Sequence, residues 1–276
     1  MRQFKYYQAY FCSFFSAKLY RDVCQNWTGL GFAYIFSLLL WLVIPVTFSF
    51  FFLSLKYIYD FQQVLHKVHQ IPVAGEQISF QLPMPYYIYD QHDPKDLIAV
   101  IDTTDKTTLE HVPNVRFLIR SSDVLIHQPY SHNVLTLPAS ALGNVVINEQ
   151  NFINLVYPYV GLGVLGFYII FLIISFVYRI LQMLIYSALG YLFFKRKRWH
   201  QGLEYGAVLR LSAIAITPAV VMSCALEAVN LYTNQFKGVA LWLLLFYFLL
   251  SMSYLFFAFH VNRSEQQLDQ KNQDPT

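Results

Sequence analysis

Four stretches of the chain are almost free of charged residues, and their lengths predict membrane-spanning helices. Residues 30–54 contain no charged side chain and suit one crossing, which takes about 20 residues. Pro45 is expected to kink this helix. The stretch begins too far into the chain to be the apolar core of a cleaved signal peptide, and no small-residue cleavage site follows it. The other apolar stretches are residues 160–194, 206–229 and 238–260.

The stretch 160–194 is longer than one crossing requires. As a single helix it measures about 52 Å at 1.5 Å per residue, whereas the hydrocarbon layer is about 30 Å thick. It is therefore either one crossing that continues past the membrane surface or two short crossings. The first interpretation gives four membrane helices in the chain, and the second gives five.

The distribution of positive charge favours four crossings. Residues 195–198 read Lys-Arg-Lys-Arg, and the amino-terminal arm is also basic. Lys and Arg near the ends of spans mark the cytoplasmic side of a membrane. A single crossing by residues 160–179 places both basic segments on that side, with residues 180–198 as a helix near the inner leaflet. Both termini are then cytoplasmic, and residues 57–155 lie outside.

This interpretation divides the chain into five parts. An amphipathic arm at 1–29 is followed by a first transmembrane helix at 30–56 and an extracytoplasmic domain at 57–155. Transmembrane helices two to four then lie within 156–262, and a disordered cytoplasmic tail is expected at 263–276. Aromatic residues recur at helical spacing in the arm, at Phe4, Tyr7, Phe11, Phe14 and Phe15. A basic, aromatic helix of this kind is typical of the headgroup plane. The alternative is a helix packed on the cytoplasmic ends of the spans.

The segment 57–155 is predicted to be rich in β-strands. Residues 57–70 continue the first helix, and short period-two runs follow, separated by turns rich in Pro, Asp, Ser and Asn. These runs are "ISFQL", "YYIY", "LIAVID", "VRFLIR", "VLIHQ" and "NVLTL". Ser121, Ser122 and Asp123 are expected to form the turn of a hairpin. The segment is thus a small domain of about 90 residues with both ends at the membrane.

Composition supports a membrane protein. Of the 276 residues 56% are hydrophobic and 13% are charged, whereas soluble domains contain about 25% charged residues. The three cysteines, Cys12, Cys24 and Cys224, lack the spacing of a metal site. The histidines of the polar segment are scattered and have no accompanying cysteine. We therefore predict no metal, no cofactor and no nucleic-acid partner.

Residues 102–109, "DTTDKTTL", resemble the phosphorylated-aspartate loop of ion-pumping ATPases. The loop's glycine is replaced by Thr108, so its tight turn is not guaranteed. A domain of about 90 residues is also too small for the nucleotide-binding parts of a pump, and the charge pattern places Asp105 outside the cell. Asp102, Thr103 and Thr104 are instead expected to end a buried strand and to satisfy free backbone groups in the turn.

The segments "LIAVIDTTDKTT", "FLIRSSDVLI", "FCSFFSAKLYRDVCQNWTGLGFAYIF" and "GLEYGAVLRLSAIAITPAVV" resemble the bacterial membrane family catalogued as domain of unknown function 1189. The resemblance covers nearly the whole chain, and the late spans are also distantly similar to Yip-type vesicle-membrane proteins. It implies a multi-pass inner-membrane protein with an outer domain inserted after the first span. It implies no catalytic residue, because the family has no established activity.

A few polar residues interrupt the apolar stretches. Arg179, Arg210 and Glu227 are functional candidates, because intramembrane charge is costly. The alternative is that each side chain snorkels to a nearby membrane surface. Thr217 and Pro218 form a predicted kink in the third span that faces the bundle interior, because Pro218 frees a backbone carbonyl. The glycine run at 161–166 would allow another helix to approach closely.

Three functions are compatible with this sequence. The first is a non-catalytic inner-membrane protein whose outer domain binds another membrane or envelope protein or an envelope component. The second is a small-molecule transporter or an accessory subunit of one, motivated by Pro218, Glu227 and the glycine run. The third is an envelope hydrolase that uses Asp102 or Asp105 with a histidine. A polar cavity among the spans would favour the second function, and an open cleft with an Asp–His pair would favour the third.

Overall fold

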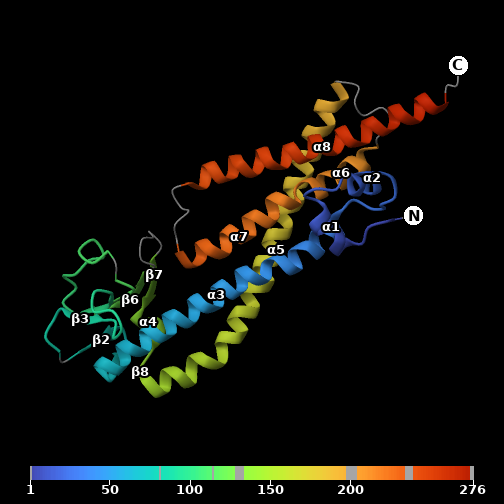
Figure 1. Ribbon diagram of the computed structural model, residues 1–276. Coiled ribbons are helices and arrows are strands. Elements are labelled where there is room, and N and C mark those ends of the chain that lie inside the picture. Colours follow the sequence, from blue (N-terminus) through green and yellow to red (C-terminus); the bar gives the residue numbers. More distant parts are fainter. Residues whose placement is uncertain are drawn as a thin grey trace. The chain divides into compact units, whose positions relative to one another are not determined.

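A computed structural model describes residues 2–80, 82–113, 115–127, 134–196, 204–233 and 239–273. The chain forms two compact units, which are described separately (Figure 1). The helical unit comprises Met1–Ser49 and Leu165–Thr276, and the β unit comprises Phe50–Val164. The long helices α3 and α5 contribute residues to both units.

Eight helices are found in the described residues: α1 (Tyr6–Cys12), α2 (Ala17–Gln25), α3 (Phe32–Val68), α4 (Ala139–Leu142), α5 (Glu149–Arg196), α6 (Tyr205–Ala215), α7 (Thr217–Thr233) and α8 (Ala240–Gln273). The strands are β1 (Gln70–Ala74), β2 (Gln77–Ile78), β3 (Tyr86–Tyr89), β4 (Leu97–Asp102), β5 (Phe117–Arg120), β6 (Asp123–His127), β7 (Val134–Pro138) and β8 (Val145–Asn148).

Four helical segments of the described chain are long and apolar enough to cross a membrane: Phe32–Val68, Glu149–Leu192, Tyr205–Leu231 and Leu241–Arg263. Residues 160–194 lie in the single uninterrupted helix α5, so the interpretation with two short helices there is not supported. Much of the apolar surface is exposed. Only 6% of the most apolar 18-residue stretch of α5 is buried, whereas 83% of the corresponding stretch of the α6–α7 segment is buried. The α6–α7 segment is therefore the centre of the helical unit.

The amino-terminal arm folds as two short helices instead of one. The break lies between Cys12 and Ala17, and α2 packs on α6 and α8. Asp22 organises the arm, because its buried carboxylate accepts hydrogen bonds from the backbone of Gln3 and Phe4 and from the side chains of Asn26 and Trp27. Burial by itself would raise the pKa of Asp22, but these bonds lower it overall.

The arm also has an exposed aromatic edge. The exposed fractions are 78% for Phe11 and 87% for Phe15, while Leu19 and Tyr20 on α2 are completely buried. One part of the arm therefore packs on the helices, as the second alternative has it, and another part presents aromatic side chains outward. Its position in the headgroup plane stays a prediction.

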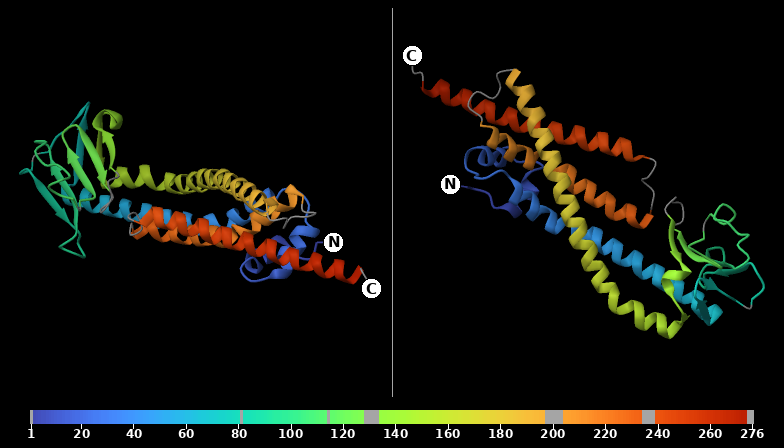
Figure 2. Two further views of the ribbon diagram at one scale, coloured as in Figure 1. Left: turned by 90° about the horizontal axis from the view of Figure 1, so that it is seen from above. Right: turned by 180° about the vertical axis from the view of Figure 1, so that it is seen from behind.

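The β unit contains two sheets. The larger has the strand order β3-β4-β5-β6-β7, and the smaller has the order β2-β1-β8. The strands β5 and β6 form the expected hairpin, with Ile119 opposite Val124. In contrast, β4 and β5 are parallel, with Asp102 opposite Arg120, so residues 103–116 form a crossover between them. The strands of the larger sheet lie side by side in the view from above (Figure 2).

Both faces of the larger sheet are covered. Val64 and Leu65 of α3 belong to a buried cluster with Ile101 and Ile119. On the other face, Val115 and partly buried residues of the crossover pack against Val100 and Leu118. Hydrophobic side chains therefore occupy both sides of β4 and β5, which explains why their apolar residues form continuous runs and not an alternating pattern.

Candidate functional site: a cavity between three helices

The helical unit contains a cavity of about 870 Å³ between α5, α7 and α8. Helix α5 crosses α7 and α8 obliquely in Figure 1 and in the right view of Figure 2. Most of the lining is apolar, but α5 and α7 add a polar strip. The polar members of the lining are Ser175, Tyr178, Arg179, Gln182, Tyr186, Ser223, Glu227, Asn230 and Tyr247. A cavity of this size lies within the range of small-molecule sites, about 300–1,000 Å³.

Arg179 is the buried cation of this cavity, with only 6% of its surface exposed. One terminal nitrogen donates to Gln182 Oε1 at 2.8 Å, and the other donates to the hydroxyl of Ser223. The guanidinium also lies 5.0 Å from the ring centre of Tyr178. Its Nε has no hydrogen-bond partner among the described residues. The guanidinium of Arg179 therefore turns into the helical unit, where it meets Ser223.

Glu227 lies on the same face of α7 as Ser223, one helical turn further along. Glu227 is exposed, and it lines the cavity together with Leu226 and Asn230. No described Lys, Arg or His lies within ion-pair distance of its carboxylate. The cavity thus carries one positive and one negative side chain that are not bonded to each other.

Arg210 has a different role from Arg179. Its guanidinium donates to the carbonyl oxygens of Val23, Cys24 and Gly29 at 3.2–3.3 Å. Val23 and Cys24 lie in the last turn of α2, where carbonyl groups lack helical partners and a cation is favourable. Arg210 therefore fastens the arm to α6, and nothing in this geometry connects it with the cavity.

Thr217 and Pro218 lie at the break between α6 and α7, and both are buried. The Thr217 hydroxyl donates to the carbonyl of Ala213 at 3.2 Å, as expected from the sequence, and it lies 2.9 Å from the hydroxyl of Tyr34 on α3. Burial of Pro218 agrees with a kink that faces the interior of the helical unit. The kink sets the direction in which α7 leaves the core toward the cavity.

The Asp102 turn is a structural device of the β unit. Asp102 ends β4, is completely buried, and accepts hydrogen bonds from the backbone and hydroxyl groups of both Thr104 and Thr107. Burial would raise its pKa, but these four bonds lower the pKa to about 2. Thr103, between Asp102 and Thr104, is a half-buried turn residue. An ionised, fully bonded carboxylate has no free lone pair directed at a substrate.

Asp105 is similarly engaged. Its backbone has a positive φ of 57°, and its carboxylate accepts hydrogen bonds from the backbone and hydroxyl of Ser121 at the β5–β6 turn. His111 lies in the same loop, and its ring bonds to the hydroxyl of Thr108 and not to either aspartate. The described residues therefore contain no Asp–His pair of the kind that the hydrolase hypothesis requires at this loop.

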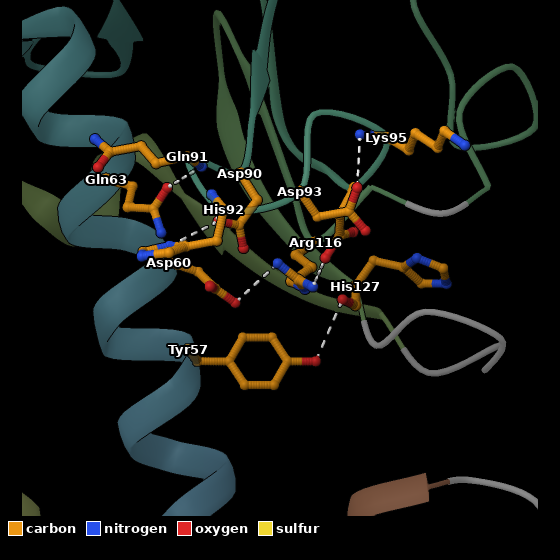
Figure 3. A network of polar contacts seen from close by, with 11 residues as sticks. Tyr57, Asp60, Gln63, Asp90, Gln91, His92, Asp93, Lys95, Arg116 and His127 are labelled. Carbon is orange, nitrogen blue, oxygen red and sulfur yellow. Dashed lines mark hydrogen bonds and ion pairs between the residues drawn. The ribbon is translucent and has the colours of Figure 1, made fainter.

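A buried ionic network in the β unit was not predicted from the sequence. Arg116 lies 3.1 Å from Asp60 of α3 through Nη1 and also pairs with Asp96 (Figure 3). The Asp60 contact lacks hydrogen-bond geometry. Because Asp60 is buried, its pKa rises to about 6, although Arg116 acts in the opposite direction. Only its place on a helix face otherwise lined by Tyr57, Phe61 and Val64 could have indicated burial.

Neighbouring contacts complete this network. The hydroxyl of Tyr57 donates to the carbonyl of His127, and the Gln63 side chain accepts the backbone N–H of Gln91 (Figure 3). These bonds tie the end of α3 to two separate segments of the β unit. We interpret the network as a structural connection, because Arg116 links buried Asp60 on α3 to Asp96 of the β unit.

Two further expectations concern sites. The described residues contain no group of three His, Cys, Asp or Glu side chains arranged to hold a metal ion.

The glycine run does not mediate close packing within the described chain, because a methyl group added at Gly161, Gly163 or Gly166 would meet no atom within 4 Å. The close approach that the run would allow is therefore not used by another described helix of this chain. Close packing occurs instead at Gly190, where an added methyl would lie 2.9 Å from Leu255.

Comparison with known proteins agrees with the family that the sequence resembles. The model of a family described as "Protein of unknown function (DUF1189)" matches residues 7–259. No curated protein and no solved structure matches the chain. The match includes most of the arm, the Asp102 turn, the α6–α7 break and both charged residues of the cavity. Since it covers most of the sequence, the chain belongs to the DUF1189 family.

Proposed function

We propose that this protein is a non-catalytic, multispanning protein of the bacterial inner membrane that binds a small molecule between α5, α7 and α8. It would serve as a transporter or as an accessory subunit of one. The observation that carries this proposal is Arg179, a buried cation with an unpartnered Nε that lines a cavity of about 870 Å³. A buried charge without a full set of partners is costly, so it is retained where a ligand completes the set.

The membrane topology in this proposal is the one that the charge pattern favours. Both termini lie in the cytoplasm, and the β unit lies outside. Four apolar helices and a basic arm support it. Reporter fusions at residues 110 and 270 should report opposite sides of the membrane. If both fusions reported the same side, the four-crossing arrangement would be wrong.

Copurification tests the binding function. Protein purified in mild detergent should carry a small molecule in near-stoichiometric amount, identified by extraction and mass spectrometry. Arg179→Gln should lose most of it, because the cation that holds it is removed. Lys18→Gln removes an equal charge from an exposed position in the arm and should retain the molecule. Equal recovery from all three proteins, or none from the unmodified protein, would contradict the proposal.

A second candidate function is partner binding by the β unit. Strand β3 is at the edge of the larger sheet, and 44% of Tyr87 and 47% of Tyr89 are exposed on it. An edge strand with exposed aromatic side chains can accept an extended segment of another protein by strand addition. Crosslinking from a photoreactive amino acid at Tyr87 in native membranes would test this. A specific adduct that is absent with the probe at exposed Glu76 would support it.

A further inference from the structure

We propose that the cavity between α5, α7 and α8 binds the headgroup of a zwitterionic phospholipid that carries a primary amine. The phosphate would bind Arg179, the amine would approach Glu227, and the acyl chains would follow the apolar wall. This proposal rests on the proposed binding function and specifies its ligand. Three features of the cavity point to it: an incompletely bonded cation, a separate carboxylate and an apolar wall that merges with exposed helix surface.

The cation is prepared for an oxyanion. A guanidinium has five N–H groups in one plane, and Arg179 directs one to Gln182 and one to Ser223, leaving Nε unpartnered in the described structure. The bonds to Gln182 and Ser223 fix the plane of the guanidinium without neutralising its charge, because both acceptors are neutral. Phosphate oxygens match the planar donor arrangement of arginine. A phosphate in the cavity would therefore offset the buried charge and accept hydrogen bonds from the remaining N–H groups of the terminal nitrogens.

The carboxylate of Glu227 determines what else the ligand carries. Ser223 and Glu227 are four residues apart on α7, so about 6 Å of helix rise separates the backbone of the residue that bonds Arg179 from that of the residue with the carboxylate. A simple anion bound at Arg179 would be repelled by Glu227. A ligand with a positive group a short distance from its phosphate would instead be attracted by both side chains. A primary amine can also donate hydrogen bonds to the carboxylate, and a headgroup of this kind fits both charges.

The apolar wall indicates an amphiphile rather than a water-soluble zwitterion. Ile174, Leu181 and Leu244 line the cavity, and their exposed fractions are 62%, 55% and 60%. The same side chains thus belong to the cavity and to the outer surface of α5 and α8. That surface continues along both helices as exposed Ile, Leu and Phe residues. Acyl chains could lie along it while the headgroup occupies the polar strip.

Native mass spectrometry with defined lipids tests the proposal. Delipidated protein is titrated with phosphatidylethanolamine and with phosphatidylglycerol of identical chains. The first lipid has the phosphate and the amine, whereas the second has the phosphate alone. We expect phosphatidylethanolamine to bind about tenfold more tightly, the ratio that follows from one charge-assisted hydrogen bond. Glu227→Gln should abolish this preference while retaining phosphatidylglycerol binding, and Arg179→Gln should weaken both lipids about tenfold.

Three controls define the alternatives. Arg179→Lys keeps the charge without the planar donors and should show an intermediate loss. Thermal unfolding in detergent reports whether Arg179→Gln remains folded, and Glu227→Gln, at an exposed position, supplies a second test that is independent of that result. Free phosphoethanolamine, added as a competitor, should displace the lipid only weakly. Displacement at concentrations equal to that of the lipid would show that the ligand is water-soluble and would overturn the proposal.

The proposal is also overturned if the unmodified protein binds the two lipids equally, or if Glu227→Gln leaves the preference unchanged. Either result, together with another copurified small molecule that depends on Arg179, would exclude the lipid but leave the proposed binding function intact. If Arg179→Gln retains all copurified molecules and binds both lipids normally, both proposals are wrong.

Discussion

The hydroxyl of Tyr34 on α3 lies 2.9 Å from the hydroxyl of Thr217, at the point where α6 ends and α7 begins. Thr217 donates its own proton to the carbonyl of Ala213, so Tyr34 is the donor in the contact between the two hydroxyls. Both residues are completely buried. The break that precedes Pro218 is therefore fastened to α3 by a hydrogen bond in the core of the helical unit, and the course of α7 toward the cavity depends on it.

Removing this bond should destabilise the helical unit measurably. Tyr34→Phe deletes the donor and should cost about 1 kcal/mol, the usual net value of a buried hydrogen bond. Thr217→Val deletes both hydroxyl bonds and should cost somewhat more. The double variant should be less destabilised than the sum, because the variants share one bond. Thermal or denaturant unfolding in detergent measures these values. Ser253→Ala, at an exposed position, is the matched control and should change little.

The buried position of the kink predicts its chemical accessibility. A cysteine placed at Ala219, which is completely buried, should not react with a thiol reagent dissolved in the lipid phase. A cysteine at Trp41 on α3, whose exposed fraction is 68%, should react readily. Both variants are made after replacement of Cys12, Cys24 and Cys224. Equal labelling at the two positions would show that the kink faces lipid.

Local features of this fold could be predicted from local sequence. Pro218 ends α6 because it lacks an N–H group, and Thr217 satisfies the Ala213 carbonyl because a threonine hydroxyl reaches back four residues. The strand that ends at Asp102 follows from the apolar run before it. Strands β1 and β8 were not predicted. Each is short, and each depends on pairing with a segment more than 70 residues away.

The candidate site shows the same limit. Arg179 and Glu227 were recognised because charge is rare in apolar helices. The sequence could not show that Ser223, 44 residues away, accepts a bond from Arg179 and so holds the guanidinium inside the helical unit. Equally, the link between Asp60 and Arg116 depends on how α3 packs on the sheet, and no local pattern encodes that packing.

The Asp102 turn should be sensitive to charge and hydrogen bonding. Asp102→Asn replaces one acceptor oxygen by an amide that faces the donors of Thr104 or Thr107, and we expect a loss of about 1–3 kcal/mol in the free energy of unfolding. Because its pKa is lowered to about 2, the ionised group stabilises the fold above its unfolded pKa of about 3.9. That contribution is lost as the pH falls from about 4 to about 2.

Asp105 should respond differently, although it lies only three residues away. Its left-handed backbone conformation suits asparagine well, and an asparagine side chain can still accept the backbone N–H of Ser121. Asp105→Asn should therefore be nearly neutral, whereas Asp105→Ala should lose about 1 kcal/mol or more. Unfolding measurements compare the two. Phosphate incorporation in the unmodified protein that disappears in Asp105→Asn would contradict a purely structural role.

Asp60 should make the β unit more stable in mild acid. Burial raises its pKa to about 6 in the folded state, above the unfolded value of about 3.9. A raised pKa means that the folded protein binds the proton more tightly, so this contribution is fully present below about pH 4 and is lost as the pH rises through about 6. Lowering the pH from 7 to 5 should thus stabilise the protein through Asp60 by an amount on the order of 1 kcal/mol.

Asp60→Asn should remove this dependence, because asparagine has the shape of the protonated acid and does not titrate. Arg116 keeps Asp96 as its second partner in the variant, so the network should remain folded. All other ionisable groups are common to both proteins, so their contributions cancel in the comparison. The unfolding free energies of the two proteins, measured at pH 7, 6 and 5, should therefore converge as the pH falls. At pH 7 the variant should be as stable as the unmodified protein or more stable. Parallel curves would mean that Asp60 is already protonated, or still ionised, throughout this range.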